Sequence, residues 1–214
     1  NIEWKYVKKA EKLSEAHIIQ SNTSLSKKII SFNRKMRYML TKTGIPLHKG
    51  CTIILYHPRR VLVDGIYKDI YTDELSEKLE NTIVLEKTYQ NMHMEPVTTK
   101  NLVYTDIVDY MIKWYSLLTT VFAREKFSRI RQEIKEKIDA PIQELDHYYG
   151  VKMDLDQLVN EIAYCYLSYK VMKKYYTNVF RKIQPCMIIE VVSYCTESMV
   201  VNEIADEFGV PSVE

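Results

Sequence analysis

The C-terminal part of the chain constrains its fold most strongly. Residues 185–194 form a nearly unbroken apolar run, which is typical of a strand buried on both faces of a parallel sheet. We predict a helix over residues 197–208, with Thr196 as its N-cap and Gly209 as its C-terminal stop. Residues 210–214 have the pattern of a further strand. A strand, a helix and a strand in this order predict a parallel α/β sheet.

The rest of the chain favours the same fold class. The first forty residues have a helical pattern, and strands are predicted over residues 52–57, 82–86 and 101–104, with a helix from Thr72 to about Glu80. Between residues 106 and 184 apolar residues recur at spacings of three and four, which predicts helices throughout; Pro141 would begin a short one and Asp154 would cap a long one. We therefore predict a single, helix-rich α/β domain over residues 1–214, with a Rossmann-like parallel sheet and a helical insertion over about 106–184.

Both ends of the sequence bear on its completeness. The chain begins with Asn1 and stops at Glu214, a few residues into a predicted strand. We expect it to be a piece of a longer protein.

Composition narrows the classes of function. Hydrophobic residues at 46% and charged residues at 27% are ordinary for a globular protein, and a formal net charge of +2 is too slight to predict a nucleic-acid partner. No apolar stretch reaches the roughly 18–20 residues of a membrane span. The four cysteines show neither a CxxC pair nor metal-type spacing, so we expect reduced, buried thiols in a cytoplasmic protein, with no metal site and no cofactor.

In open parallel sheets, ligands bind beyond the carboxyl ends of the strands. The first predicted strand ends at His57-Pro58-Arg59-Arg60. His57 can act as a base near neutral pH, and Arg59 and Arg60 can hold a phosphate or a carboxylate. The alternative is a histidine that caps the strand, followed by two solvated arginines.

Two further groups end strands. Glu86 can bind sugar hydroxyls, or it can form a surface ion pair with Lys87. Tyr194, Thr196 and Glu197 lie where a strand turns into a helix, and the amides of that helix can hold an anion. No glycine-rich loop supports an anion site there, and Glu197 would repel a phosphate, so a capping role is the alternative.

Tyr67, Asp69 and Tyr71 alternate in the segment that follows the two arginines. Aromatic faces and carboxylates suit sugar binding, so these residues can line an acceptor pocket. They can equally form the exposed face of a short strand, and the sequence leaves both open.

Residues 202–214, preceded by the apolar strand that ends at Tyr194, resemble a segment of bacterial glycosyltransferases built from two Rossmann-like domains (the GT-B arrangement). The similarity is to capsular and cell-surface polysaccharide enzymes and, more distantly, to CDP-glycerol glycerophosphotransferases. In these proteins a helix ending in a Gly-Ile/Val-Pro turn leads into a strand, and a Gln-His-Gly motif commonly follows. Residues 54–60 and 64–72 resemble the acceptor-side portion of the same enzymes, whereas the helical insertion matches no part of them.

The resemblance implies the acceptor-side domain of an enzyme of cell-surface polysaccharide synthesis. Such an enzyme transfers a sugar or glycerol phosphate from a nucleotide-activated donor to a saccharide or lipid-linked acceptor. A C-terminal domain outside this chain would bind most of the donor, so the chain alone is expected to be inactive. His57 would be the base, and Arg59 and Arg60 would hold the anion. The resemblance also implies a cytoplasmic enzyme, with peripheral association at the inner face of the plasma membrane left open, and the oligomeric state is open too.

The main alternative is a non-catalytic module that binds another protein through the helical insertion. The helix predicted over residues 154–184 carries more tyrosines than one buried stripe can hold, namely Tyr164, Tyr166, Tyr169, Tyr175 and Tyr176. Surface aromatic residues often mark a partner interface. Tyrosines that line a cleft at the strand ends would favour an acceptor site, and a flat patch far from those ends would favour a partner.

Overall fold

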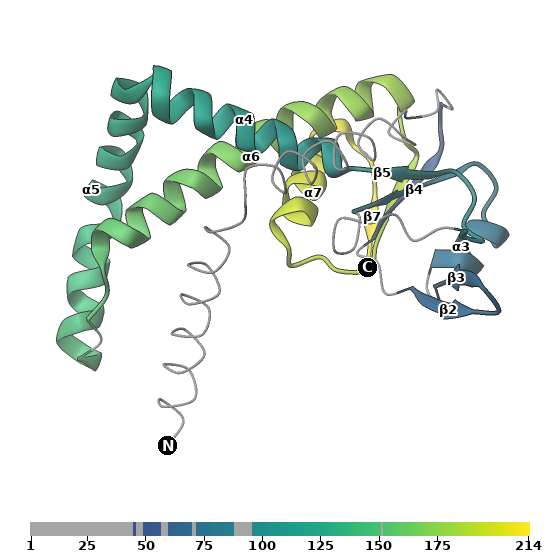
Figure 1. Cartoon of the computed structure of the whole chain (residues 1–214), viewed down its shortest axis with the longest axis horizontal. Coiled ribbons are helices and arrows are strands. Elements are labelled where there is room, and N and C mark those ends of the chain that lie inside the picture. Colours follow the sequence, from purple (N-terminus) through teal and green to yellow (C-terminus); the bar gives the residue numbers. More distant parts are fainter. Residues whose placement is uncertain (1–44, 46–48, 57–59, 70–71, 88–95, 151) are drawn as a thin grey trace, which may run out of the picture. The chain divides into compact units, whose positions relative to one another are not determined.

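The computed structural model describes residues 45, 49–56, 60–69, 72–87, 96–150 and 152–214 (Figure 1). The chain divides into two compact units, residues 1–41 and 42–214, and every described residue belongs to the second. The helical pattern of the first forty residues therefore lies outside the described residues, as do His57, Arg59 and Tyr71. The prediction of a single domain over the whole chain stays a prediction.

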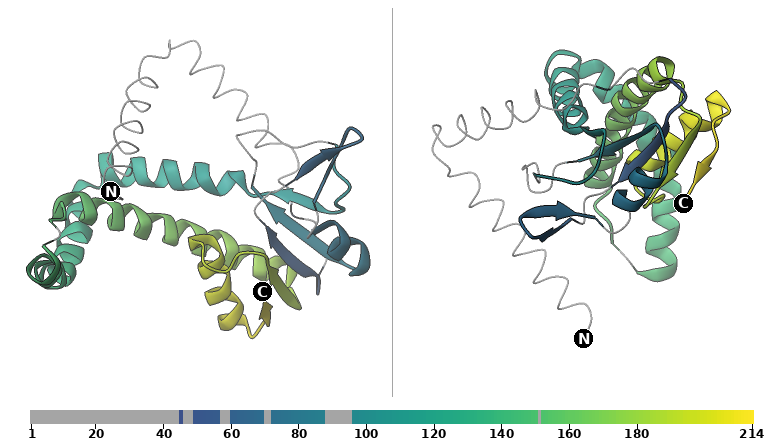
Figure 2. Two further views of the ribbon diagram at one scale, coloured as in Figure 1. Left: turned by 90° about the horizontal axis from the view of Figure 1, so that it is seen from below. Right: turned by 90° about the vertical axis from the view of Figure 1, so that its right-hand side faces the viewer.

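A five-stranded, all-parallel sheet forms the centre of the described unit, in the order β5-β4-β1-β6-β7 (Figures 1 and 2). Its strands are β1 (Thr52–Tyr56), β4 (Thr82–Glu86), β5 (Leu102–Tyr104), β6 (Met187–Glu190) and β7 (Ser212–Val213). In the central strand, Thr52 pairs with Thr82 on one side and with Met187 on the other. The predicted helix-rich α/β fold with a parallel sheet is confirmed.

Helices cover both faces of this sheet. Successive residues of a strand point to opposite faces, so each strand contributes apolar side chains to both. Ile54 and Val84 face α3 (Thr72–Lys78), whose Leu75 packs on them. Ile53 and Leu85 face the opposite core, to which α4 (Asp106–Phe122), α6 (Leu155–Ile183) and α7 (Thr196–Phe208) contribute. The helical residues buried there include Val108, Met172, Tyr176, Phe180, Val201 and Ile204.

The helices between β5 and β6 extend past the sheet as an arm, visible in Figure 1 as the α4–α5–α6 assembly. We call residues 114–122 of α4, all of α5 (Arg124–Tyr149) and residues 155–167 of α6 the helical arm. A separate small core of Ile130, Ala163 and Leu167 holds it together. None of the helices in the described part of the chain is long and apolar enough to cross a membrane.

Two predicted element boundaries are wrong. Pro141 does not begin a helix, because α5 runs from Arg124 to Tyr149 with this proline in its interior. The strand predicted over residues 185–194 is confined to Met187–Glu190, which pairs with β1 on one side and, at Ile188 and Ile189, with β7 on the other. Met187 and Ile189 are also partly exposed, so this strand is not buried on both faces.

The N-cap of α7 is Cys195 and not Thr196, which is the first residue of the helix. The Cys195 Sγ accepts a hydrogen bond from the Ser198 amide at 3.4 Å. The C-terminal stop at Gly209 and the capping of α6 by Asp154 are as predicted; the Asp154 Oδ1 accepts from the Gln157 amide at 3.0 Å.

A small antiparallel hairpin follows β1, made of β2 (Val61–Val63) and β3 (Ile66–Lys68). Asp64 and Gly65, between the strands, both have positive φ angles of 52° and 78°, the geometry of a type I′ turn. The sequence prediction placed these residues in a loop, although Asp-Gly between apolar residues is a known hairpin signature.

The cysteines are free, as expected, but most of them are not buried. Cys51 is buried and Cys195 is partly buried, whereas Cys165 and Cys186 are exposed. Cys165 lies on the outer side of the arm helix α6 and Cys186 immediately precedes the short strand β6, so an apolar neighbourhood in sequence did not imply burial.

We predict that Gly209→Ala destabilises the unit by about 1 kcal/mol, because a side chain at φ 65° is strained. A Cβ at this position meets no atom within 4 Å, so the backbone conformation alone carries the cost. Urea denaturation measures it. Gly209→Asn should lose less than Gly209→Ala, since Asn tolerates the left-handed region; equal losses would contradict the assignment.

Candidate ligand site at the carboxyl edge of the sheet

The strand order reverses between β1 and β6. From β1 the chain moves outward through β4 and β5, and it then returns to the other side of β1 as β6 and continues outward to β7. Ligands of open α/β sheets bind at such a reversal, beyond the carboxyl ends of the two strands. Residues 191–195 follow β6 directly and border the candidate site.

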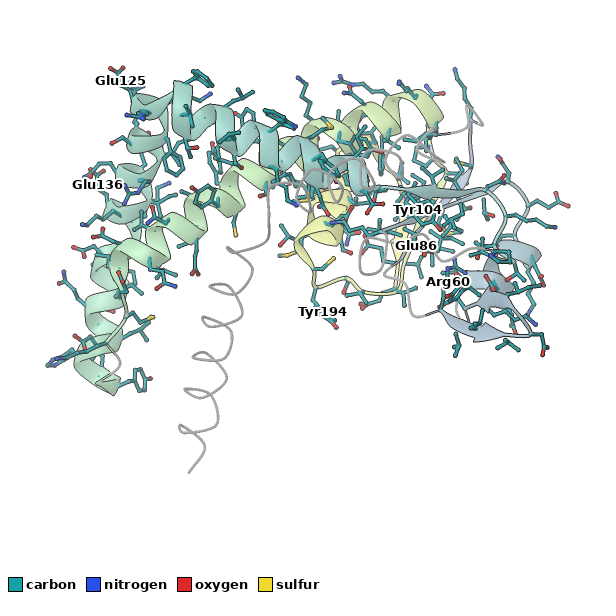
Figure 3. All side chains as sticks on the ribbon, viewed as in Figure 1. Arg60, Glu86, Tyr104, Glu125, Glu136 and Tyr194 are labelled. Carbon is teal, nitrogen blue, oxygen red and sulfur yellow. The ribbon has the colours of Figure 1, made fainter. Side chains whose placement is uncertain are left out.

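A buried ion pair lies beside this reversal. The Arg60 guanidinium donates to the Glu86 carboxylate from Nη2 at 2.6 Å and from Nε at 3.1 and 3.2 Å. Both side chains are almost fully buried, and Figure 3 shows them close together at the end of β4. Burial alone would lower the pKa of Arg60, but the hydrogen bonds and charge of Glu86 outweigh it and raise that pKa. The arginine is therefore charged and already paired.

Asp73 of α3 extends this cluster. It lies 3.5 Å from the Arg60 Nη1 and accepts hydrogen bonds of 2.5 Å from the hydroxyls of Thr98 and Thr99. Burial would raise the pKa of Asp73, yet the two threonine hydrogen bonds and the charge of Arg60 lower it on balance. Two carboxylates thus share one guanidinium.

Asp69 forms hydrogen bonds at the N-terminus of α3. Its Oδ1 accepts from the Thr72 amide at 2.8 Å, and its own amide donates to Asp73 Oδ2 at 2.9 Å. This reciprocal pair satisfies backbone donors at the start of the helix. Asp69 is buried, so it does not present a carboxylate to the surface.

A second polar cluster joins β4, α4, α6 and α7. The Lys87 ammonium lies 2.9 Å from Glu197 Oε2 and 3.3 Å from Asp109 Oδ1, and the buried Tyr176 hydroxyl donates to Glu197 Oε1. Burial would lower the pKa of Lys87, but the two carboxylates outweigh it and raise that pKa. Because Lys87 neutralises Glu197, the repulsion of an anion by Glu197 is weaker than its position in the sequence predicted.

Glu190, the last residue of β6, lies at the reversal itself and is 3% exposed. Its Oε2 accepts from Asn202 Nδ2 of α7 at 2.9 Å, whereas its Oε1 has no hydrogen-bond partner among the residues that the structure describes. Burial raises the pKa of Glu190 to about 7, and the charge of Glu214 acts in the same direction. This carboxyl group therefore exchanges a proton near neutral pH.

The loop after β6 forms hydrogen bonds at Val192 and Ser193, and the side chain that follows them is exposed to solvent. The Ser198 hydroxyl donates to the Val192 carbonyl at 2.5 Å, and the Ser193 amide donates to Glu214 Oε1 at 3.4 Å. Tyr194, labelled in Figure 3, is 79% exposed in this loop. Thr196 is exposed as well. Both predicted residues are therefore accessible to a ligand.

The predicted residues thus fall into different surroundings. Arg60, Asp69 and Glu86 share the first cluster, in which they contact protein groups, and Glu197 belongs to the second. Tyr67 lies on β3, partly buried, and its amide donates to the Pro96 carbonyl at 2.8 Å. The ligand-binding roles given to these residues stay predictions.

The sequence analysis missed Glu190. The available signal was a carboxylate inside an otherwise apolar run, which marks the point where a strand meets the sheet edge. Its partner Asn202 carried no signal, because the contact arises only when α7 folds back on β6.

Comparison with protein-family models, with curated proteins and with solved structures finds no match. No cluster of three or more metal-ligating side chains occurs among the residues that the structure describes.

We predict that Arg60→Met costs about 3–5 kcal/mol of unfolding free energy, because it leaves the buried Glu86 carboxylate without its cation. The double variant Arg60→Met/Glu86→Leu should recover most of this loss. Urea denaturation followed by circular dichroism measures both. Lys78→Met, which breaks the exposed pair with Glu74, is the matched control and should cost less than about 1 kcal/mol. A loss of that small size for Arg60→Met would contradict the buried pair.

From the raised pKa of Glu190 we predict that the stability of the folded protein depends on pH. Its pKa is about 7 in the folded protein and 4.5 ordinarily, so between these pH values the folded state holds a proton that the unfolded state releases. Stability should therefore fall as the pH rises from about 4.5 to 7, and Glu190→Gln should remove that fall. At pH 8 the variant should be more stable than the parent by up to about 3 kcal/mol, and at pH 4 the two should agree.

Thermal or urea denaturation across this pH range tests the prediction. Glu144→Gln, at an exposed position of α5, is the control and should leave the profile unchanged. A Glu190→Gln variant that is less stable than the parent at pH 8 would show that the ionised carboxylate stabilises the fold.

Proposed function

We propose that this chain is the acceptor-side α/β domain of a glycosyltransferase-like enzyme of cell-surface polysaccharide synthesis. The enzyme would transfer a sugar or glycerol phosphate from a nucleotide-activated donor. The observation that supports this most is the reversal of strand order between β1 and β6, because one of the segments that resemble such enzymes begins in β1 and α7, which carries part of another, follows β6. The resemblance in residues 202–214 falls on α7 and β7, and that in residues 54–60 falls on β1 and the segment after it.

The reaction assigns roles to the residues beyond β1 and β6. For a sugar donor, the acceptor hydroxyl gives its proton to a base while its oxygen bonds to the donor carbon. The bond from that carbon to the phosphate oxygen breaks, and the electron pair leaves with the nucleotide. His57 follows β1 directly and is the proposed base, and Arg59 is the proposed partner of the leaving phosphate.

Arg60 is less suited to hold that phosphate than its neighbour. Its guanidinium donates to Glu86 and lies against Asp73, so binding a ligand anion would require an exchange of partners. Tyr194 and Thr196, both exposed on the other side of the reversal, are the proposed contacts for the acceptor. Aromatic side chains such as Tyr194 offer a flat apolar face to a sugar ring.

Two-dimensional NMR of the 214-residue chain tests this proposal. Titration with an oligosaccharide acceptor should shift the amide signals of residues 191–196, and CDP-glycerol or a UDP-sugar should cause smaller shifts, because most of the donor site is assigned to another domain. His57→Gln and Tyr194→Ser should each weaken acceptor binding about tenfold. His147→Gln, at an exposed position at the end of α5, is the matched control.

One observation favours the alternative, a non-catalytic module that binds another protein through the helical arm. Tyr164 and Tyr166 are exposed on the arm, away from the strand ends, whereas Tyr176 is buried at the sheet edge. If no saccharide or nucleotide shifts residues 191–196, the acceptor-site proposal is overturned, and a binding module that uses the arm becomes the better account.

A further inference from the structure

The helical arm carries an apolar surface whose residues belong to none of the buried clusters of the described residues. It lies on the second half of α4, where five large apolar side chains are exposed: Trp114 at 55%, Leu117 at 50%, Leu118 at 47%, Val121 at 44% and Phe122 at 80%. We call these five residues the α4 outer face. Isolated exposed apolar residues are common, but a contiguous group of this size marks a binding surface.

The α4 outer face is distinct from the side of the helix that packs. At 100° per residue its five members fall within an arc of roughly 140° around the helix axis. The packed side holds Val108, buried in the main core, and Tyr115, which packs on the small core of the arm. The second half of α4 therefore has a further apolar side that the described residues leave uncovered.

Charge is distributed unevenly around this surface. Residues 114–123 contain no charged side chain, and the first turns of α5 then bring three exposed cations, Arg124, Lys126 and Arg129, against one exposed anion, Glu125. Glu125 is labelled in Figure 3, where it marks the corner between α4 and α5. An apolar helix end is thus bordered by a net positive charge.

We propose that the α4 outer face, with Arg124, Lys126 and Arg129, binds the surface of an anionic phospholipid bilayer. The apolar side chains would enter the boundary between headgroups and acyl chains, where Trp is favoured. The three cations would contact lipid phosphates, which attract basic residues next to a membrane-bound apolar segment. The protein would lie on the membrane without crossing it. This inference is independent of the proposed enzymatic function.

Charge complementarity favours the bilayer over two other occupants. A symmetric dimer through the same face would bring the cations of both copies together, which is unfavourable. Residues 1–41 carry nine lysines and arginines against three glutamates, so they too share the sign of the surface that they would cover. An anionic bilayer matches both the apolar face and its basic border.

Vesicle binding tests the proposal. The full chain should sediment with large unilamellar vesicles of phosphatidylglycerol and phosphatidylcholine, and far less with phosphatidylcholine alone. In a Trp4→Phe background Trp114 is the single tryptophan, so its emission should shift to the blue and brominated lipids should quench it. Leu118→Ser/Phe122→Ser should lower the partition coefficient at least about tenfold.

Two matched controls distinguish binding through the α4 outer face and its cations from nonspecific binding to vesicles. Tyr148→Ser/Tyr149→Ser removes exposed aromatic residues at the other end of α5 and should leave binding unchanged. Arg124→Gln/Lys126→Gln/Arg129→Gln should weaken binding to anionic vesicles about tenfold or more. The triple variant Lys100→Gln/Lys152→Gln/Lys182→Gln, with the same change in net charge, should have a much smaller effect.

Three results would overturn the proposal. The first is the absence of vesicle binding by the folded chain. The second is binding that Leu118→Ser/Phe122→Ser does not weaken, which would place the contact elsewhere, for example in residues 1–41. The third is a concentration-dependent dimer in analytical ultracentrifugation that Phe122→Ser abolishes, which would assign the face to a second copy of the chain.

Discussion

The fold depends on the pairing of β1 with two strands that are far apart in the sequence. β4 follows after a hairpin and a short helix, whereas β6 arrives only after α4, α5 and α6. Parallel strands cannot be joined by a tight turn, so each pairing requires an excursion over one face of the sheet. The entropy of closing a loop rises slowly with its length, so a long excursion is tolerated if it returns to a buried position. The second half of α6 ensures that return, because Met172, Tyr176 and Phe180 are buried against the sheet just before β6 begins.

This arrangement explains how far the sequence could predict the fold. Element types with a strong local pattern were predicted correctly, such as the β-branched strand β1 and the helix that Gly209 ends. The predicted boundaries were wrong where the local sequence pattern and the tertiary contacts favour different ends for an element. Pro141 reads locally as a helix start, yet α5 is long enough on both sides to continue through it. The apolar run after Glu190 reads locally as a strand, but in the structure β6 ends at Glu190, where its pairing with β1 ends at Leu55. At the start of α7 the cap is a thiol, which is a weak acceptor and is seldom considered.

The candidate site was harder to predict than the fold, because its chemistry depends on distances between segments. A strand-ending carboxylate such as Glu86 has the same local sequence whether it binds a ligand or a buried cation. Only the approach of the Arg60 guanidinium to 2.6 Å decides between these uses, and that distance joins two segments that are 26 residues apart in the sequence. The same holds for Glu197, whose charge is neutralised by a lysine that follows β4. Sequence reasoning pointed to residues at one edge of the sheet, but it could not separate side chains that stabilise that edge from side chains that stay exposed there.

Two features of the described residues are not explained by the stability of the fold. At the sheet edge, the buried Glu190 has one oxygen without a hydrogen-bond partner among the described residues, and Tyr194 in the loop that follows is exposed. On the arm, the α4 outer face is exposed although α4 is already held by its other side. A fold under selection for stability alone would be expected to pair the buried oxygen and to replace exposed Trp114 and Phe122 with polar residues. Because the residues that hold α4 on the sheet differ from those of its outer face, the two features can be altered separately. A function at the strand ends and an attachment through the arm are therefore compatible, because α6 packs on the sheet with one half and on the small core of the arm with the other.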